Sequence, residues 1–142
     1  MTIAIPPESP RLQPTGWLRY FSFSVDHKVI GLQYLVCGFA FYLVGGALAG
    51  AIRTELASPV SDFMARDVYN QVLTLHGTVM IFLWIVPVVN GAFGNYLIPF
   101  YVGARDMAFP RLNAVAFWLI PPAGLLLITS YFITGAAQSG WT

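Results

Sequence analysis

Three long runs of this chain contain no Asp, Glu, Lys or Arg. They are Val29–Ile52, Val68–Ala104 and Leu112–Thr142. A helix needs about 20 mainly apolar residues to cross the hydrocarbon core of a bilayer, so each run is long enough. Charged residues make up only 9% of the chain, against about 25% in a soluble domain. The sequence therefore predicts an all-α integral membrane protein with three transmembrane helices, over about 29–52, 68–98 and 112–134.

The segment before the first run divides into two parts. Residues 1–16 are rich in proline and lack the basic start and apolar core of a signal peptide, so we expect a disordered tail. Residues 17–142 form the membrane part. Trp17–Phe23 is aromatic and suits the headgroup level of a bilayer. Asp26 is expected to cap the first helix, because a carboxylate accepts from the free amides of a first turn.

The distribution of Lys and Arg predicts the orientation. Five of them lie in the tail and the second loop, and two lie in the first loop: Arg11, Arg19, Lys28, Arg105 and Arg111, against Arg53 and Arg66. The positive-inside rule then places the N-terminus in the cytoplasm, as expected for a bacterial plasma membrane. The formal net charge of +1 gives no basic patch. We therefore expect the lipid bilayer, and no nucleic acid, as a partner.

The second helix is longer than a bilayer requires. At 1.5 Å per residue, residues 68–98 extend about 46 Å, so the helix must tilt, protrude or kink. Pro87 is the predicted kink and Pro99 the predicted end.

The first helix is rich in small residues, among them Gly38, Gly45, Gly46 and Gly50. Small residues let helices approach closely in lipid. Helix packing is the simplest interpretation, and close approach of a bound ring system is the alternative.

His76 is the residue with the strongest functional indication. It lies inside the second run, where an imidazole is costly and usually has a partner and a task. Its lone pair is a good ligand for iron, copper or zinc. The alternative is a histidine hydrogen-bonded to a neighbouring helix. Gly77 removes side-chain bulk beside any flat macrocycle, which suits a haem, although a single histidine cannot fill both axial positions.

Arg53, Glu55 and Cys37 each allow a simpler interpretation. Arg53 is either a membrane anchor or a donor to a polar group of a cofactor. Glu55 and Asp62 offer oxygen ligands for a cation, or else lie in a solvated loop. Cys37 is the one cysteine of the chain, so no disulfide framework is expected and it is read as a small buried hydrophobe.

A second group of candidates lies around the second loop. Asp106 lies in that loop, Asn95 near the end of the second helix and Asn113 near the start of the third. Amides hydrogen-bond water well, and a carboxylate at a channel mouth collects protons. The alternative is that all three are turn and cap residues.

Together these stretches resemble the first three helices of subunit I of the haem-copper terminal oxidases, and cytochrome c oxidase most closely. The resemblance covers residues 17–142 in the family's order and spacing. It rests on Val25–Gly31, Ile52–Leu56, Tyr69-Asn70, Leu75–Phe82, Gly94–Pro99, Gly103–Asn113 and Gly140–Thr142.

The resemblance implies a low-spin haem site, taken here as haem a. His76 is similar to the axial ligand of its iron, and Arg53 to the arginine that hydrogen-bonds its formyl group. Trp141 resembles the tryptophan near its propionates. Glu55 resembles a carboxylate of a peripheral cation site that some members have.

The resemblance also implies a proton-uptake path that Asp106 opens, with Asn95 and Asn113 as its asparagines. The implied activity is electron transfer from cytochrome c to oxygen with proton translocation. The implied partners are the rest of subunit I, subunits II and III and cytochrome c. Quinol-oxidising members are the first alternative. They add Arg, Asp and His where this chain has Val44, Leu48 and Val68, which favours cytochrome c as the donor.

The family's subunit I has about twelve helices, so this chain is expected to be an N-terminal fragment. Copper and the high-spin haem would belong to the remaining helices, and the chain alone is not expected to reduce oxygen. A membrane scaffold without catalysis is the second alternative.

Overall fold

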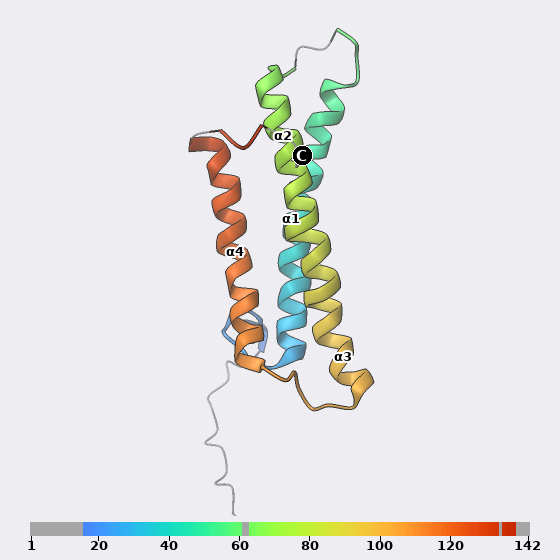
Figure 1. Cartoon of the computed structure of the whole chain (residues 1–142), viewed down its shortest axis with the longest axis vertical. Coiled ribbons are helices and arrows are strands. Elements are labelled where there is room, and N and C mark those ends of the chain that lie inside the picture. Colours follow the sequence, from blue (N-terminus) through green and yellow to red (C-terminus); the bar gives the residue numbers. More distant parts are fainter. Residues whose placement is uncertain (1–15, 61–62, 134, 139–142) are drawn as a thin grey trace, which may run out of the picture.

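The computed structural model describes residues 16–60, 63–133 and 135–138. Figure 1 shows long helices lying side by side: α1 (His27–Glu55), a continuous helical segment over Arg66–Val102, and α4 (Pro110–Ile133). The described residues contain no strand. All three helices are long and apolar enough to cross a membrane. The predicted all-α fold with three membrane helices is confirmed, and each helix extends slightly beyond its predicted bounds at one or both ends.

A short 3-10 helix, η1 (Gly16–Phe21), precedes α1. Its aromatic side chains are exposed, as an interfacial segment requires: Trp17 is 69% and Phe21 66% exposed. The predicted cap is also present, because the Asp26 carboxylate accepts a hydrogen bond of 2.9 Å from the Lys28 amide. The proposed tail lies in residues outside the described range, apart from Gly16.

The second helix changes its winding along its length. It begins as α2 (Arg66–Thr78), widens to π-helical geometry in η2 (Val79–Ile85) and η3 (Pro87–Phe93), and returns to α-helix in α3 (Gly94–Val102). Pro87 has no N–H for the carbonyl four residues earlier, which disfavours α-helical hydrogen bonding there. We expected a kink at this proline, and the structure shows a change of winding.

The prediction that Pro99 ends the second helix is wrong. The helix continues through Pro99 to Val102 and ends at Gly103, which has a φ of +72°. Glycine adopts this left-handed conformation without the steric cost of a Cβ. The Ala104 amide then donates to the Pro99 carbonyl at 2.9 Å and closes the last turn. Pro99 has no backbone N–H to donate to the Asn95 carbonyl. A side chain of another helix donates to that carbonyl instead, as described below.

Close packing of α1 uses the glycines that the sequence indicated. A Cβ at Gly38 would lie 2.7 Å from Val88 Cγ2, and one at Gly45 would lie 2.5 Å from Met80 Sδ. Both positions therefore need glycine because the second helix lies directly against them. By contrast, a Cβ at Gly46 or Gly50 would meet no heavy atom within 4 Å.

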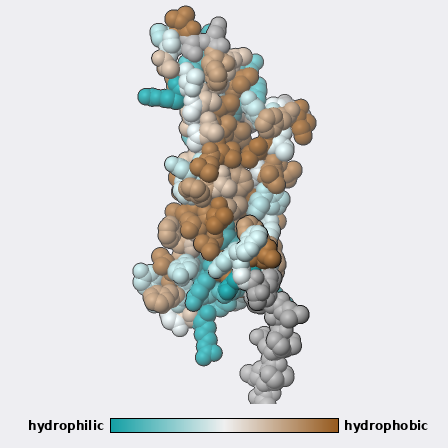
Figure 2. Space-filling model, turned by 180° about the vertical axis from the view of Figure 1, so that it is seen from behind, coloured by the Kyte–Doolittle hydropathy of each residue, from teal (hydrophilic) through white to brown (hydrophobic). Residues whose placement is uncertain are grey.

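The core is small and most apolar side chains lie outside it. One cluster of buried residues holds Ile30, Tyr34, Ala92, Ala114 and Phe117, and the other holds Phe41, Leu75, Val79 and Leu83. Figure 2 shows hydrophobic residues over much of the middle of the molecule and strongly hydrophilic ones mostly nearer its ends. This outward apolar surface is what a bilayer solvates.

Candidate functional site

His76 lies in α2 and is half-buried against α1. Its Nδ1 atom is 2.9 Å from the backbone carbonyl oxygen of Gly45. A carbonyl oxygen only accepts, so Nδ1 donates and carries the ring proton. The lone pair is therefore on Nε2. Metal-binding histidines usually have their other nitrogen held in this way, which fixes both the tautomer and the ring plane.

The surroundings of His76 are low in bulk. Gly77 follows it directly, and Gly46 follows the residue that accepts its hydrogen bond. A Cβ at either position would meet no heavy atom within 4 Å. Among the described residues no three His, Cys, Asp or Glu side chains come together as a metal site. The chemistry of this site therefore fits a haem, which brings its own four nitrogen donors, better than an all-protein metal cage.

Arg53 lies in the last turn of α1 and is exposed. It is eight residues beyond Gly45, about 12 Å along the helix. Among the described residues it has no hydrogen bond or ion pair, so its guanidinium is available to a group outside them. Glu55 has a structural contact, because its Oε2 accepts from the Met64 amide at 3.0 Å and closes the first loop. Trp141 and Asp62 lie outside the described residues.

The structure brings two of the predicted proton-path residues together at the other end of the bundle. Asn95, in α3, is only 4% exposed, and its side-chain oxygen accepts a short hydrogen bond from Asn113 Nδ2 in α4. Asn95 Nδ2 in turn donates to the Gly91 carbonyl at 2.7 Å. The pair therefore joins two helices through a polar contact.

Asp106 is not hydrogen-bonded to that pair. Its Oδ1 accepts from the Met107 amide at 2.7 Å, and the side chain is half-buried in the loop between α3 and α4. The structure thus places the three residues in one end region of the bundle and bonds only the two asparagines to each other.

His27 is a residue that the sequence analysis passed over. It is 5% exposed, and its Nδ1 donates to the backbone carbonyl of Asn95 at 2.8 Å. In an α-helix that carbonyl would accept from the residue four positions later, which is Pro99 and has no N–H. His27 supplies the missing donor. Pro99 itself was the available indication, since a proline inside a helix leaves one carbonyl without its helical donor.

The comparisons with known proteins identify the family to which the chain is similar. A sequence profile of the family described as "Cytochrome C and Quinol oxidase polypeptide I" matches residues 29–142. Cytochrome c oxidase subunit 1 of Thermostichus vulcanus is 62% identical over 136 residues, which are 96% of this chain and 24% of the relative. The same subunit of Synechocystis sp. is 61% identical over 142 residues, which are 100% of this chain and 25% of the relative.

A third relative is the haem-copper oxidase subunit I+III of Aeropyrum pernix. It is 44% identical over 128 residues, which are 89% of this chain and 16% of the relative. The chain thus spans about a quarter of the length of the first two relatives. The profile match and the three membrane helices lead to one conclusion: the chain belongs to the cytochrome c and quinol oxidase polypeptide I family and is an integral membrane protein.

Proposed function

We propose that the chain is part of the catalytic subunit of a respiratory terminal oxidase. The complete enzyme would transfer electrons from cytochrome c to oxygen, reduce it to water and translocate protons across a bacterial plasma membrane. The observation that carries this proposal is the hydrogen bond between His76 Nδ1 and the Gly45 carbonyl. This bond leaves the Nε2 lone pair to act as the proposed ligand. A Cβ at Gly77 or Gly46 would meet no heavy atom within 4 Å, which is compatible with a macrocycle beside the ring.

In this proposal His76 is an axial ligand of the low-spin haem, taken as haem a. Its second axial ligand would come from outside this chain. The bound haem would supply one-electron redox chemistry. The Gly45 carbonyl holds the imidazole in one orientation. Arg53 would donate to the formyl oxygen of the haem, and Trp141 is proposed as the tryptophan near its propionates. Copper and the high-spin haem would be held by the rest of subunit I.

Proton uptake is assigned to the opposite end. Asp106 would collect protons from the cytoplasm, where we also place the N-terminus. Asn95 and Asn113 would pass them on through water held by their amide groups. The bond between these two asparagines supports the assignment, because it joins an amide of α3 to an amide of α4 in the end region of the bundle that also holds Asp106.

The proposed partners are the remainder of subunit I, subunits II and III and cytochrome c. The name of the Aeropyrum relative joins subunits I and III in a single chain, which supports a contact between those two. Glu55 is proposed as one ligand of a peripheral cation, in addition to its contact with the Met64 amide.

The ligand assignment is tested by His76→Ala in the assembled oxidase. We expect the low-spin haem absorption and its electron paramagnetic resonance signal to disappear, because a haem iron loses one of its axial ligands. His27→Gln is the matched control, since it alters a histidine with the same type of hydrogen bond at the other end of the bundle. A normal low-spin spectrum in His76→Ala would refute the assignment.

The proton assignment is tested by Asp106→Asn, with proton uptake followed by a pH-sensitive dye in vesicles. We expect slower uptake with unchanged haem content. Asp67→Asn, which removes an exposed carboxylate at the other end of the bundle, is the control. Unchanged proton pumping in Asp106→Asn would count against the path.

The electron donor is tested separately, because the family description includes quinol oxidases. Membranes containing the enzyme should oxidise reduced cytochrome c faster than a soluble quinol. The reverse preference would assign the chain to the quinol-oxidising members, and the haem assignment would stand.

A further inference from the structure

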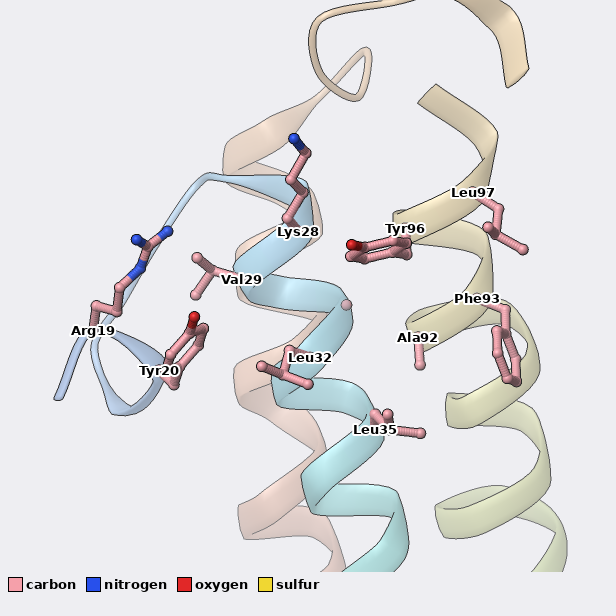
Figure 3. A pocket seen from close by; sticks show the side chains of 11 residues that line it. Arg19, Tyr20, Lys28, Val29, Leu32, Leu35, Ala92, Phe93, Tyr96 and Leu97 are labelled. Atoms are coloured by element: carbon pink, nitrogen blue, oxygen red, sulfur yellow. The ribbon is translucent and has the colours of Figure 1, made fainter. Parts of the chain in front are cut away.

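A hollow of about 600 Å³ lies at the end of the bundle where α1 begins, between η1, the first turns of α1 and the η3–α3 part of the second helix. Figure 3 shows its two basic side chains toward one end, with Arg19 on the η1 side of α1 and Lys28 at the start of α1, while Tyr96 lies across α1 from Arg19. The other end is apolar, with Leu32, Leu35 and Phe93. The hollow is therefore an amphipathic groove, and we call it the Arg19–Lys28 groove.

The polar end of the Arg19–Lys28 groove carries uncompensated positive charge. Asp26 is the acid beside it, with Oδ2 3.7 Å from Arg19, but its Oδ1 is already bonded to the Lys28 amide. The Nε atom of Arg19 is buried and has no hydrogen-bond partner among the described residues. Lys28 is exposed and forms no ion pair within them. Two cations thus face one acid.

The position of the groove along α1 matches the boundary between headgroups and acyl chains. Arg19, Tyr20 and Lys28 lie at the helix start, beside the exposed aromatic residues of η1. Leu35 is seven residues further along α1 than Lys28, about 10 Å deeper. Aromatic and basic side chains are typical of the interface, and aliphatic ones of the hydrocarbon.

We propose that the Arg19–Lys28 groove binds one anionic phospholipid. Its phosphate lies between Arg19 and Lys28 and accepts from them, and one acyl chain lies along Leu32, Leu35 and Phe93. Basic pockets between membrane helices recognise lipid headgroups in this way. A zwitterionic headgroup is disfavoured, because its own cation would add to two others.

A protein helix is a less suitable occupant of the same groove. It would remove Arg19 and Lys28 from water, and a buried charge needs a partner of opposite sign. A phosphate supplies that partner at the depth where the two cations lie. This argument is independent of the haem assignment, because His76 is not among the residues that line the groove.

The test uses the complete, assembled oxidase in nanodiscs that contain a trace of phosphatidylglycerol with a photoreactive acyl chain, or phosphatidylcholine with the same chain. We expect phosphatidylglycerol to label the peptides around Leu32–Leu35 and Phe93–Leu97. Each basic residue near a membrane surface contributes about fivefold to binding of an anionic lipid. Arg19→Gln with Lys28→Gln should therefore weaken the apparent affinity by roughly 30-fold.

Arg66→Gln is the matched control, because it removes an exposed cation at the other end of the bundle and should leave the labelling unchanged. The haem spectrum of every variant verifies that the oxidase has assembled. Absence of labelling in the unaltered enzyme would show that protein fills the groove and would overturn the proposal. Equal labelling by both lipids, unaffected by the double substitution, would also overturn it, because the contact would then be unspecific.

Discussion

Two histidines of this bundle make the same type of hydrogen bond, but the backbone needs only one of the two bonds. His76 and His27 each donate through Nδ1 to a backbone carbonyl of another helix, at 2.9 and 2.8 Å. The carbonyl at Asn95 needs His27, because Pro99 cannot donate to it. The carbonyl at Gly45 has no such need, since Ala49 in α1 can donate to it as in any α-helix.

The two imidazole rings also differ in how deeply they are buried. His27 is 5% exposed and lies at a polar helix junction. His76 is half-buried, and a Cβ at Gly77 or Gly46 would meet no heavy atom within 4 Å. The hydrogen bond therefore completes the fold at His27, whereas at His76 it orients a ring whose other nitrogen is available. The contact at His76 is therefore compatible with the proposed ligand role, because α1 does not need it to satisfy the Gly45 carbonyl.

The largest effect in this comparison is expected from filling the space beside His76. In Gly77→Leu the new side chain would meet no protein atom near its Cβ, but it would occupy the space proposed for the haem. Overpacking costs about 1–3 kcal/mol, and each 1.4 kcal/mol is tenfold in affinity. We expect most of the low-spin haem to be lost from the purified oxidase, as measured by its absorption.

Gly50→Leu is the control for Gly77→Leu, because its Cβ also has open space and it lies further along α1. Equal haem content in both variants and in the unaltered enzyme would contradict the placement of the haem beside Gly77.

The second effect is expected at His27. In His27→Ala the buried Asn95 carbonyl loses its donor, which should lower the free energy of unfolding by about 1–3 kcal/mol. Thermal denaturation of the assembled oxidase measures this change, and the low-spin haem spectrum should remain.

A second substitution sharpens the His27 prediction. Pro99→Ala restores an N–H four residues after Asn95, so it should recover part of the stability lost in His27→Ala. If Pro99→Ala changes the free energy of unfolding equally with and without His27, then His27 does not replace the missing N–H of Pro99.

A smaller effect is expected from the asparagine pair. Asn113→Ala leaves the buried Asn95 side-chain oxygen without its donor, so the melting temperature should fall by an amount equivalent to about 1–2 kcal/mol. Asn90→Ala, on the exposed side of the same helix as Asn95, is the control. A loss of proton uptake without a loss of stability would indicate that the pair holds water and contributes little to packing.

The smallest effect is expected at the cap of α1. Asp26→Ala removes the acceptor for the Lys28 amide and should cost about 1 kcal/mol. Asp26→Asn keeps an acceptor and should recover most of this loss in the same denaturation experiment. If Asp26→Asn is as unstable as Asp26→Ala, the ion pair with Arg19 is more important than the cap.

The sequence predicted the features that depend on composition and local spacing. The three charge-free runs identified the helices, and Asp26 identified the cap. The small residues of the first helix indicated close packing, which the structure shows at Gly38 and Gly45 but not at Gly46 and Gly50. His76 was identified as a functional candidate because an imidazole within a long apolar run is costly and usually has a partner.

The features that the sequence analysis missed depend on contacts between distant segments. The bond from His27 to Asn95 joins residues 68 positions apart. Without it, Pro99 is expected to end the helix, as we predicted wrongly. The π-helical winding around Pro87 also depends on how the second helix fits along α1, because Val88 and Met80 contact Gly38 and Gly45 there. Local patterns do not contain this information.

The central claim is that Nε2 of His76 is available as a haem ligand because Nδ1 is held by Gly45. Pulsed electron paramagnetic resonance of the oxidised low-spin haem, with histidine labelled by ¹⁵N separately at each ring position, tests it directly. The account predicts strong coupling from a histidine Nε2 and a protonated remote Nδ1 in the unaltered oxidase, and loss of the low-spin signal in His76→Ala. Coordination through Nδ1, or a low-spin signal with the same histidine coupling in His76→Ala, would contradict it.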